Sequence, residues 1–419
     1  MPRRFLFAIR TYAPDKVGGG ARSVQNLAEG LKGRGHDVHV VRLVPKGGEA
    51  KWQAEAEAAG LIGPDKPTLH FLPLRNIFWP YDLKPHGALA KALWHLRDLS
   101  NVAARRDFRA LVEQVKPDVV NTSIIDGFST AIFAAAKAGG AKLVHTMRDY
   151  YLVCQRSGMF RNGQNCETLC APCKLSASVR RGHTRNVDLF LANSAYVADT
   201  NERFGAFPDG VPTLVQWNIN ERAPADGPKT LPADKVIFGF IGRIAPAKGL
   251  EKLLAAAERL REGAGRDWEL IVAGTGEAAF EAELRARYAA NPRIRFLGWS
   301  KPADFYDVVD VLCCPSTYNE PLPRVIYEGY GFALPTISAD TGGIPEIVED
   351  ARSGYLYQAD DVATLAERME RFRTMDADAY RGMSARALAL ADQFAPDTVL
   401  ATYERRIEAV LAGDMGALV

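Results

Sequence analysis

The sequence predicts an α/β protein built from two doubly wound domains, each with a parallel sheet. The chain has 419 residues, which is longer than a single hydrophobic core usually supports. Short apolar runs recur along it, and each is followed by a stretch of helical length, which is the pattern of βαβ units. A polar, proline-rich segment at 218–235 interrupts this pattern, so we interpret it as the linker between the domains.

The first domain is expected over residues 1–217. Its apolar runs are nearly continuous rather than alternating, which is typical of strands that helices cover on both faces. The predicted strands of this domain are FLFAI (5–9), VHVVRLV (38–44), DVVNT (118–122), KLVHT (142–146), LFLAN (189–193) and TLVQW (213–217).

The second domain is expected over residues 236–395, and residues 396–419 are predicted to form a C-terminal helix that packs back on the first domain. Ligands of open parallel sheets bind beyond the carboxyl ends of the strands. We therefore expect the two domains to face a ligand across a cleft, and we expect its binding residues in the loops after strands. The predicted strands of the second domain are VIFGFIG (236–242), WELIVAG (268–274), IRFLG (294–298), DVLCCPS (310–316) and LPTISA (334–339).

The composition is that of an ordinary soluble globular protein, with 47% apolar and 24% charged residues and a net charge of +2. Such a balance gives no reason to expect a nucleic-acid partner. No apolar run reaches the roughly 18 residues of a membrane helix. The opening MPRRFLFAIRTYAP is too short in its apolar part for a signal peptide and lacks a cleavage site, so we interpret it as the first strand. The expected location is the cytoplasm.

Two glycine-containing loops could hold an anion or only form turns. The loop DKVGGGARSV (15–24) follows the first strand and contains Gly19 and Gly20. Its glycines allow a ligand close to the backbone, and the next helix points free N–H groups at an anion. The alternative is a flexible turn. The loop GTGE (274–277), with Gly274, is equally well explained by a tight turn into a helix.

Two cations follow the first strand of the second domain. The loop GRIAPAKG (242–249) contains Arg243 directly after the strand and Lys248 just before a helix. Arginine offers a planar fork and lysine a point charge, a combination that suits a diphosphate. The alternative is a pair of solvated surface charges.

Two carboxylates lie on either side of a turn in NEPLPRVIYEGYGFALPTISADTGGIPE (319–346). Glu320 lies in the loop after a buried strand and Glu328 in the following helix. A carboxylate can accept two hydrogen bonds from a vicinal diol. The spacing therefore allows Glu328 to bind a ribose and Glu320 to bind another polyhydroxylated group, and the alternative is a solvated acidic surface.

Three motifs together give a family resemblance. They are GGGARSVQNLAEGLKGRGHDVHVV (18–41), GRIAPAKGL (242–250) and the block from Pro315 to Tyr357, which has two glutamates eight positions apart and a later Gly-Gly-x-x-Glu. In this order they resemble the retaining glycosyltransferases of the GT-B fold, specifically glycosyltransferase family 4. The resemblance spans most of the chain, and its second-half motifs are the specific ones.

The resemblance implies transfer of a hexose, with retention, from a UDP- or GDP-linked donor to a glycan or polyprenyl-linked acceptor in cell-surface polysaccharide synthesis. No cofactor is implied for catalysis, because cations of the protein replace a divalent metal. Arg243 and Lys248 would hold the diphosphate and stabilise it as the leaving group. Glu320 would contact the transferred sugar.

Further donor contacts follow from the same resemblance. Glu328 would hold the ribose hydroxyls, and the backbone N–H groups of Arg324 and Val325 would meet the phosphate. A sugar-nucleotide 2-epimerase of the same architecture and a non-catalytic subunit that binds nucleotide sugar or glycan are the alternative functions.

The sequence departs from the family pattern at three places. Pro323 stands where the family has glycine in Glu-Pro-Phe-Gly, and it has no N–H to donate. Ile219 follows Asn218 where the family often has glycine. Arg148 stands at the histidine of a His-Asp-Tyr stretch, and we favour it as the site residue over His145, which we expect in the core.

Four cysteines gather within twenty residues, in the spacing C-x11-C-x3-C-x2-C. Short hooks of this kind bring thiolates together, and tetrahedral zinc with a structural role explains them best in a cytoplasmic chain. The alternatives are an iron–sulfur cluster and a loop of thiols without metal. The four are Cys154, Cys166, Cys170 and Cys173, whereas Cys313 and Cys314 end an apolar strand and are expected in the core.

The acceptor side is expected in the first domain. The stretch at 71–99 is rich in aromatic and apolar residues beside Arg75, Lys84 and Lys91. It would suit a peripheral contact with the inner face of the membrane, where a lipid-linked acceptor is presented. The alternative is a buried loop and helix packed on the first domain.

Overall fold

The computed structural model describes residues 1–14, 18–82, 84–221, 225–263 and 265–418. The chain forms two compact units. The first unit comprises Met1–Met159, Glu167–Ile219 and Pro396–Val419, and the second comprises Phe160–Cys166 and Asn220–Ala395. The expected linker at 218–235 contains residues 222–224, and the expected glycine loop contains residues 15–17, which all lie outside the described residues.

The first unit is built on a seven-stranded sheet in the order β3-β2-β1-β4-β5-β8-β9. Every neighbouring pair in this sheet is parallel. The order reverses between β1 and β4, which makes their carboxyl ends the topological switch point of a doubly wound sheet. The strands are β1 (Arg4–Ile9), β2 (Asp37–Val44), β3 (Thr68–Pro73), β4 (Val119–Thr122), β5 (Lys142–Met147), β8 (Leu189–Ala192) and β9 (Thr213–Val215).

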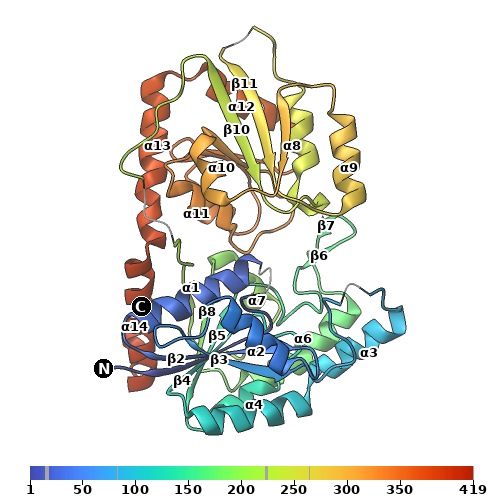
Figure 1. Cartoon of the computed structure of the whole chain (residues 1–419), viewed down its shortest axis with the longest axis vertical. Helices are drawn as coiled ribbons and strands as arrows, with labels where there is room; N and C mark the ends of the chain where they lie inside the picture. Colours follow the sequence, from blue (N-terminus) through green and yellow to red (C-terminus); the bar gives the residue numbers. More distant parts are fainter. Residues whose placement is uncertain (15–17, 83, 222–224, 264, 419) are drawn as a thin grey trace. The chain divides into compact units, whose positions relative to one another are not determined.

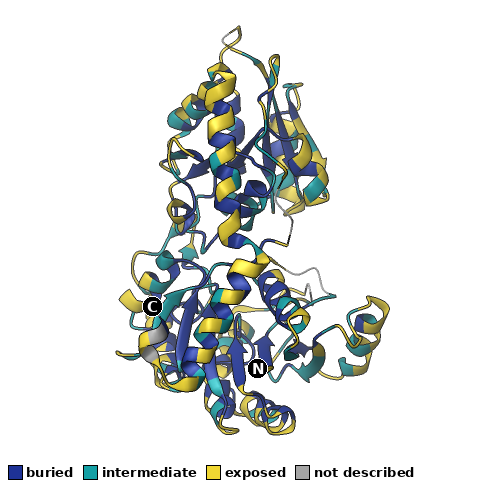
Figure 2. Cartoon of the chain, turned by 90° about the vertical axis from the view of Figure 1, so that its left-hand side faces the viewer, coloured by how far each residue is buried: buried dark blue, intermediate teal, exposed yellow. Residues whose placement is uncertain are grey.

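Helices cover both faces of this sheet (Figure 1). Figure 2 shows the strands buried and the outer faces of the helices exposed, as the near-continuous apolar strands require. Helix α14 follows the second unit in sequence but belongs to the first, where Leu400 packs so tightly on α1 that a Cβ at Gly30 would lie 2.8 Å from its Cδ1. The helices are α1 (Gly19–Gly33), α2 (Glu49–Ala58), α3 (Ala88–Leu99), α4 (Val102–Val115), α5 (Ile132–Lys137), α6 (Ala171–Thr184), α7 (Ala195–Arg203) and α14 (Pro396–Ala412), followed by the 3-10 turn η4 (Met415–Leu418).

The second unit repeats this design with a six-stranded parallel sheet in the order β12-β11-β10-β13-β14-β15. Alternate residues of one strand enter different cores, since Phe238 packs with α8 and α12 whereas Ile237 packs with α10. The switch point lies between β10 and β13. The strands are β10 (Lys235–Ile241), β11 (Asp267–Ala273), β12 (Ile294–Gly298), β13 (Val311–Cys314), β14 (Thr336–Ala339) and β15 (Gly354–Tyr357).

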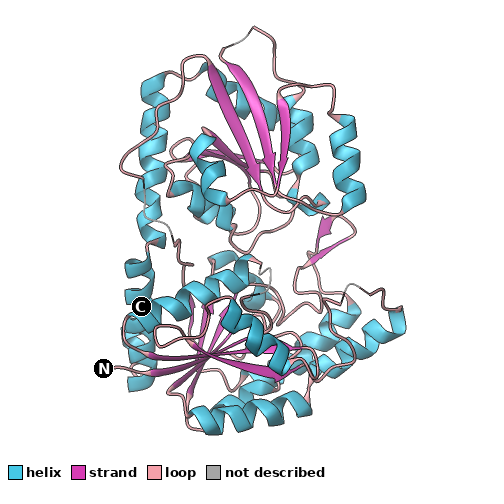
Figure 3. Cartoon of the chain, viewed as in Figure 1, coloured by secondary structure: helices cyan, strands magenta, loops and turns pink. Residues whose placement is uncertain are grey.

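Helices again lie on both faces of the sheet in the second unit (Figure 3). Most are short, and three are single 3-10 turns. They are η1 (Pro246–Lys248), α8 (Leu250–Ala257), α9 (Ala278–Arg287), α10 (Pro302–Val308), α11 (Arg324–Tyr330), η2 (Ile344–Glu346), α12 (Val362–Thr374), α13 (Ala377–Ala391) and η3 (Asp392–Phe394).

A small hairpin crosses from the first part of the sequence into the second unit. Strands β6 (Phe160–Arg161) and β7 (Gln164–Asn165) pair antiparallel around Asn162-Gly163, a dipeptide that favours two-residue hairpin turns. The surrounding cysteine-rich chain belongs to the first unit, but the hairpin itself groups with the second.

The stretch at 71–99 divides between two kinds of structure. Residues up to Pro73 finish the edge strand β3, and residues from Ala88 form α3. Most of the apolar side chains of α3 are not buried, since only Trp94 and Leu99 among them are. Within the described ranges, no helix combines the length and the apolar character needed to cross a bilayer.

Gly249 is required by the way two loops of the second unit meet. Its φ angle is +68°, and a Cβ there would lie 1.8 Å from the carbonyl oxygen of Pro315. We expect Gly249→Ala to lower the melting temperature of the second unit by roughly 6 °C or more, because the substitution adds a backbone clash to a left-handed strain of about 1–2 kcal/mol. Differential scanning calorimetry of the full chain measures the shift.

Gly263→Ala is the matched control. Gly263 has nearly the same φ, +71°, but a Cβ there meets nothing within 4 Å. It should therefore carry only the left-handed strain and lower the melting temperature by about 2–4 °C. Equal shifts for the two variants would contradict the steric argument.

Candidate functional site

Three loops converge at the carboxyl ends of β10, β13 and β14, which are neighbours in the sheet of the second unit. The loops after β10 and β13 flank the switch point, where a doubly wound sheet leaves a crevice for a ligand. The first loop carries Lys248, the second Glu320, and the third the Gly342-Gly343 pair. Residues distant in sequence thus meet at the carboxyl end of the sheet.

Lys248 and Glu320 form the central ion pair of this site. The Lys248 ammonium donates to Oε1 of Glu320, and the Ser316 hydroxyl donates to the same oxygen over 2.8 Å. Glu320 is only 6% exposed, so its charge needs both partners. The Lys248 side chain is 29% exposed. Its ammonium has three N–H donors in all, which leaves donors for an anionic ligand.

Backbone contacts fix the loop that carries Glu320. The amides of Thr317 and Tyr318 donate to the carbonyl of Ala247 over 3.1 and 3.2 Å, and the amide of Gly343 donates to the carbonyl of Glu320 over 2.8 Å. Gly342 has a φ of +57°, and a Cβ there would lie 2.2 Å from the carbonyl oxygen of Glu320. The Gly342-Gly343 pair therefore allows the backbone of this loop to lie against the backbone of Glu320.

Asn165 of the hairpin holds the same loop from another direction. Its amide nitrogen donates to the carbonyl of Thr317 over 2.8 Å, and its amide oxygen accepts from the backbone N–H of Asn319 over 2.9 Å. Phe160 meets the ring of Tyr318 edge to face, with centroids 5.8 Å apart. The sequence analysis did not identify Asn165. Its Asn-Gly turn signals a hairpin, but no local pattern indicates the partner of the hairpin.

Arg243 is exposed and follows Gly242 at the end of β10. Gly274 lies beside this loop, and a Cβ there would come within 1.8 Å of the carbonyl oxygen of Gly242. The amide of Ile244 donates to the carbonyl of Thr275 over 3.0 Å. The glycine at 274 is thus needed for the packing of one loop on the other, whatever else it contacts.

Glu328 is held in place by two side chains. The Tyr306 hydroxyl donates to Oε2 over 3.0 Å, and the Arg324 guanidinium donates to Oε1 through Nε and Nη2 over 3.0 and 2.7 Å. Burial raises the pKa of Tyr306, so its hydroxyl stays protonated and can donate. Arg324 and Val325 begin α11 directly after the Glu320 loop. The carboxylate is therefore oriented before any ligand arrives.

Arg148 follows β5 in the first unit and is only 8% exposed. Its guanidinium donates to the side-chain oxygen of Asn218. A Cβ at Gly20 would lie 2.5 Å from Cδ1 of Ile124 and 4.0 Å from Cβ of Arg148. The first turn of α1, which holds Gly19 and Gly20, thus passes close to Arg148 at the carboxyl ends of the strands.

His145 lies inside the core of the first unit. It is 3% exposed, and its Nδ1 is 2.8 Å from the hydroxyl of Thr122. Its ring packs against Phe133 and Phe190. Burial lowers the pKa of His145 to about 3, so it is neutral at physiological pH and structural in character.

Three of the four clustered cysteines contact one another in the first unit. The thiols of Cys154 and Cys173 are hydrogen-bonded, as are those of Cys173 and Cys170. The hydrogen bond from Cys173 lowers the pKa of Cys154 to about 5. Cys166 ends the hairpin segment that groups with the second unit. Within the described part of the chain, no group of three or more His, Cys, Asp or Glu side chains is arranged to hold a metal ion.

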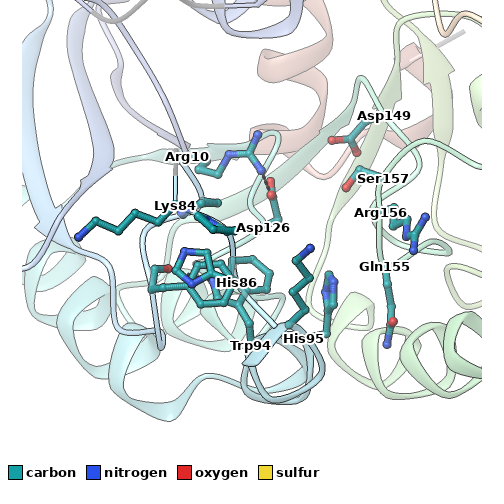
Figure 4. A pocket seen from close by; sticks show the side chains of 14 residues that line it. Arg10, Lys84, His86, Trp94, His95, Asp126, Asp149, Gln155, Arg156 and Ser157 are labelled. Atoms are coloured by element: carbon teal, nitrogen blue, oxygen red, sulfur yellow. Dashed lines mark hydrogen bonds and ion pairs between the residues drawn. The ribbon is translucent and has the colours of Figure 1, made fainter. Parts of the chain in front are cut away.

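The first unit also contains a cavity of about 420 Å³ that the sequence analysis did not predict. Figure 4 shows Arg10 paired with Asp126 in this cavity, with Trp94 and His95 of α3 and the Gln155–Ser157 segment on its other sides. Arg10 directly follows β1 and Asp126 closely follows β4. The available sequence signal for Arg10 and Asp126 was a polar residue shortly after a predicted strand.

Two family models match the chain, one in each half. The model described as Glycosyltransferase Family 4 matches residues 17–213. The model described as Glycosyl transferases group 1 matches residues 222–387.

Related sequences include an uncharacterized 42.6 kDa protein in the cps region of Klebsiella pneumoniae. It is 30% identical over 336 residues, which cover 80% of this chain and 85% of that protein. The D-inositol 3-phosphate glycosyltransferase of Streptomyces scabiei is 34% identical over 234 residues, about half of each chain (51% and 52%).

Solved structures of similar fold cover nearly the whole chain. HepE from Anabaena in complex with UDP superposes with a TM-score of 0.69 at 18% identity, covering 97% of this chain and 100% of that one. Sucrose-phosphate synthase from Thermosynechococcus elongatus also gives a TM-score of 0.69, at 16% identity and with 98% and 100% of the chains covered.

The two doubly wound sheets agree with these structural matches, and the family models account for both halves of the chain. The chain therefore belongs to glycosyltransferase family 4 and has the GT-B fold.

Proposed function

We propose that the protein is a retaining transferase that moves a hexose from a UDP- or GDP-linked donor to a glycan or polyprenyl-linked glycan in cell-surface polysaccharide synthesis. The observation that carries this proposal is the ion pair between Lys248 and the buried Glu320 at the switch point of the second unit. It sets a partly exposed cation beside a fixed carboxylate, which suits a phosphate next to a sugar.

Lys248 and Arg243 hold the diphosphate of the donor. In the reaction the bond between the sugar C1 and the diphosphate oxygen breaks and its electron pair goes to the diphosphate. C1 forms a bond to the oxygen of the acceptor hydroxyl, and the proton of that hydroxyl passes to the departing diphosphate. Negative charge therefore grows on the diphosphate in the transition state. Cations at this position bind the diphosphate and also lower the activation barrier of transfer. Stabilisation of the diphosphate then requires no metal ion.

The two glutamates bind hydroxyl groups of the donor. Glu320 accepts from the transferred sugar near the reacting carbon, and Glu328, already oriented by Tyr306 and Arg324, accepts from the ribose. The backbone amides of Arg324 and Val325 complete the phosphate contacts. Structures of HepE with UDP and with UDP-glucose support a nucleotide-sugar donor for this fold.

The acceptor is assigned to the first unit. In the same unit Arg148 is assigned to the transferred sugar, and the first turn of α1 with Gly19 and Gly20 is assigned to an anion of the donor. Peripheral contact of the cytoplasmic protein with the inner face of the membrane is supported by α3. Its Leu89, Leu93 and Leu96 are 74%, 45% and 61% exposed and lie on one side of the helix. Such a face suits the boundary between lipid head groups and acyl chains.

Family membership favours glycosyl transfer over the sugar-nucleotide 2-epimerase and binding-subunit alternatives. The block with two glutamates eight positions apart argues against the epimerase, and slow hydrolysis of the donor by the purified protein would argue against a subunit that only binds.

Lys248→Ala and Glu320→Ala should each reduce transfer to about 1% or less of the wild-type turnover. Lys248→Ala removes a cation at the developing charge, and Glu320→Ala removes a contact at the reacting sugar. Each such group contributes roughly 100-fold to the turnover. The donors are chosen from a panel of nucleotide sugars by their thermal stabilisation of the wild type. Turnover is then measured as the release of nucleoside diphosphate that depends on the acceptor.

Glu328→Ala is the comparison variant. It should chiefly weaken donor binding, with a smaller effect on turnover, because its contacts are with the ribose and not the reacting bond. Wild-type turnover in Lys248→Ala or Glu320→Ala, with the variants correctly folded, would remove the roles assigned to these residues.

Asn165 is expected to position the Glu320 loop without touching the donor. Asn165→Asp keeps the acceptor for the Asn319 amide but cannot donate to the Thr317 carbonyl. One lost hydrogen bond of about 1 kcal/mol should lower the turnover roughly fivefold, with little change in the melting temperature. Asn165→Ala should lower the turnover further.

Gln164→Ala, an exposed change in the same hairpin, is the control for Asn165 and should leave the turnover unchanged. A loss of stability without a change in turnover for Asn165→Asp would mean that the residue only holds the hairpin together.

The clustered cysteines are proposed to bind one structural zinc ion, with an iron–sulfur cluster as the alternative. Cys173 contacts both Cys154 and Cys170, and Cys166 lies four residues before Cys170, a spacing from which it can supply a fourth ligand once the metal draws the thiolates together. Freshly purified protein should contain about one zinc per chain by elemental analysis.

Cys170→Ser should lose this metal, while Cys313→Ala, at a buried strand position, should retain it. Sub-stoichiometric zinc and iron in the wild type, or full metal in Cys170→Ser, would end the metal proposal.

A further inference from the structure

We infer that the acceptor carries an anionic group, a carboxylate or a phosphate, and that the cavity around Arg10 in the first unit binds it. This inference rests on the proposed function, because it names the chemistry of the acceptor that the transferase would use. It concerns residues of the first unit alone and none of those assigned to the donor.

The position of the cavity favours a ligand. Arg10 follows β1 and Asp126 follows β4, and the order of the sheet reverses between these two strands. The carboxyl ends of strands at such a reversal leave a crevice that helices cannot fill. The cavity of about 420 Å³ lies within the range of volumes of small-molecule sites.

The charge of the lining is positive. Four basic side chains, Arg10, Lys84, Lys91 and Arg156, line the cavity with only two acids, Asp126 and Asp149. Asp126 is neutralised by its ion pair with Arg10. Burial raises the pKa of Asp149 to about 6, so this carboxylate is still mostly ionised at neutral pH and counts as an acid in the lining. The balance of four cations against two acids attracts an anion.

Three of the basic side chains form no ion pair with a carboxylate in the described part of the chain. Arg10 is paired, but among the described residues no ion pair links Lys84, Lys91 or Arg156 to an acid. In Figure 4 Lys84 extends away from the other labelled side chains, so Lys91 and Arg156 are the better candidates for direct contact. Arginine can bind a carboxylate or a phosphate through two parallel hydrogen bonds.

Three buried polar atoms in the lining have no hydrogen-bond partner among the described residues. Nε of Arg10, Oδ1 of Asp126 and Nδ1 of His95 are buried without a hydrogen bond among the described residues. Asp126 as a whole is only 8% exposed. A buried polar group without a partner is costly and needs an explanation. An anion in this cavity could accept from Nε of Arg10, whereas Oδ1 of Asp126 needs a donor, such as a hydroxyl of the same acceptor.

A second cavity shares Arg10 and suits the sugar part of the same acceptor. Its volume is about 510 Å³, and its lining includes the aromatic rings of Trp52, Trp79 and Tyr81. The Arg10 guanidinium lies 5.1 Å from the centre of the Tyr81 ring. Aromatic rings offer flat apolar surface with polar edges, which fits the C–H face of a sugar. Arg10 therefore stands between a cavity for a sugar ring and a cavity for an anion.

Binding measurements with defined probes test the inference without requiring transfer. Calorimetric titration of the full chain compares geranyl diphosphate with geraniol and glucuronate with glucose, so that each anion has a neutral partner. We expect at least one anion to bind about tenfold or more tightly than its partner. A preference for the diphosphate identifies a lipid headgroup as the source, and a preference for glucuronate identifies an acidic sugar.

Variants locate the binding. The double variant Lys91→Ala/Arg156→Ala should weaken binding of the preferred anion about tenfold or more. The matched control Lys174→Ala/Arg185→Ala removes the same charges at exposed positions of the first unit outside the cavity, and it should bind the anion as the wild type does. Lys248→Ala should also retain this affinity, because the site is separate from that of the donor.

Three results would overturn the inference. They are equal affinity for each anion and its neutral partner, unchanged affinity in Lys91→Ala/Arg156→Ala, and loss of affinity in Lys248→Ala. The proposed function fails separately, through wild-type turnover in Lys248→Ala, so the two failures are distinguishable.

Discussion

The candidate donor site depends on pairing one carboxylate where little water reaches it. Glu320 is nearly buried, and a buried charge without partners would cost roughly several kcal/mol. Lys248 and Ser316 supply the partners from the loop after β10 and the end of β13. The backbone around Glu320 is fixed in turn by Ala247 and Gly343. Gly342 is required because any Cβ would collide with the Glu320 backbone.

The same topological feature appears in both units and gives each a place for a ligand. Each sheet starts with a central strand, extends to one side, and then reverses to the other. In the second unit the reversal is occupied by the Lys248–Glu320 pair, which leaves a cation partly exposed. In the first unit it is occupied by the Arg10–Asp126 pair beside a cavity with an excess of basic side chains. Both units therefore place an ion pair where the strand order reverses. In the second unit the ion pair fills this place, whereas in the first unit it lies beside an open cavity lined by basic side chains.

Much of the fold could be predicted because parallel strands that are buried on both faces appear in the sequence as continuous apolar runs. The prediction of two doubly wound sheets and of the GT-B fold is confirmed. Strands β3 and β15 were not predicted. Both lie at an edge of their sheet, and β3 is only half-buried, so its apolar run is weaker. The roles of Lys248, Glu320 and Glu328 stay predictions. Their loops could be found from sequence, but the contact of Lys248 with Glu320 joins residues 72 positions apart. Nothing local in RNGQN indicates that Asn165 will hold Thr317 and Asn319.

The cysteine-rich segment and the donor loop are connected through this hairpin. The thiol contact between Cys154 and Cys173 draws together the two ends of a segment within which Asn165 lies. Closing a loop removes conformations from the chain before the hairpin forms, so less entropy is lost when Asn165 binds Thr317 and Asn319. Any bond or metal that strengthens the closure would act in the same direction. The cysteines and the hairpin thus belong to one stretch of chain, and a closure between Cys154 and Cys173 would limit the conformations open to the hairpin between them.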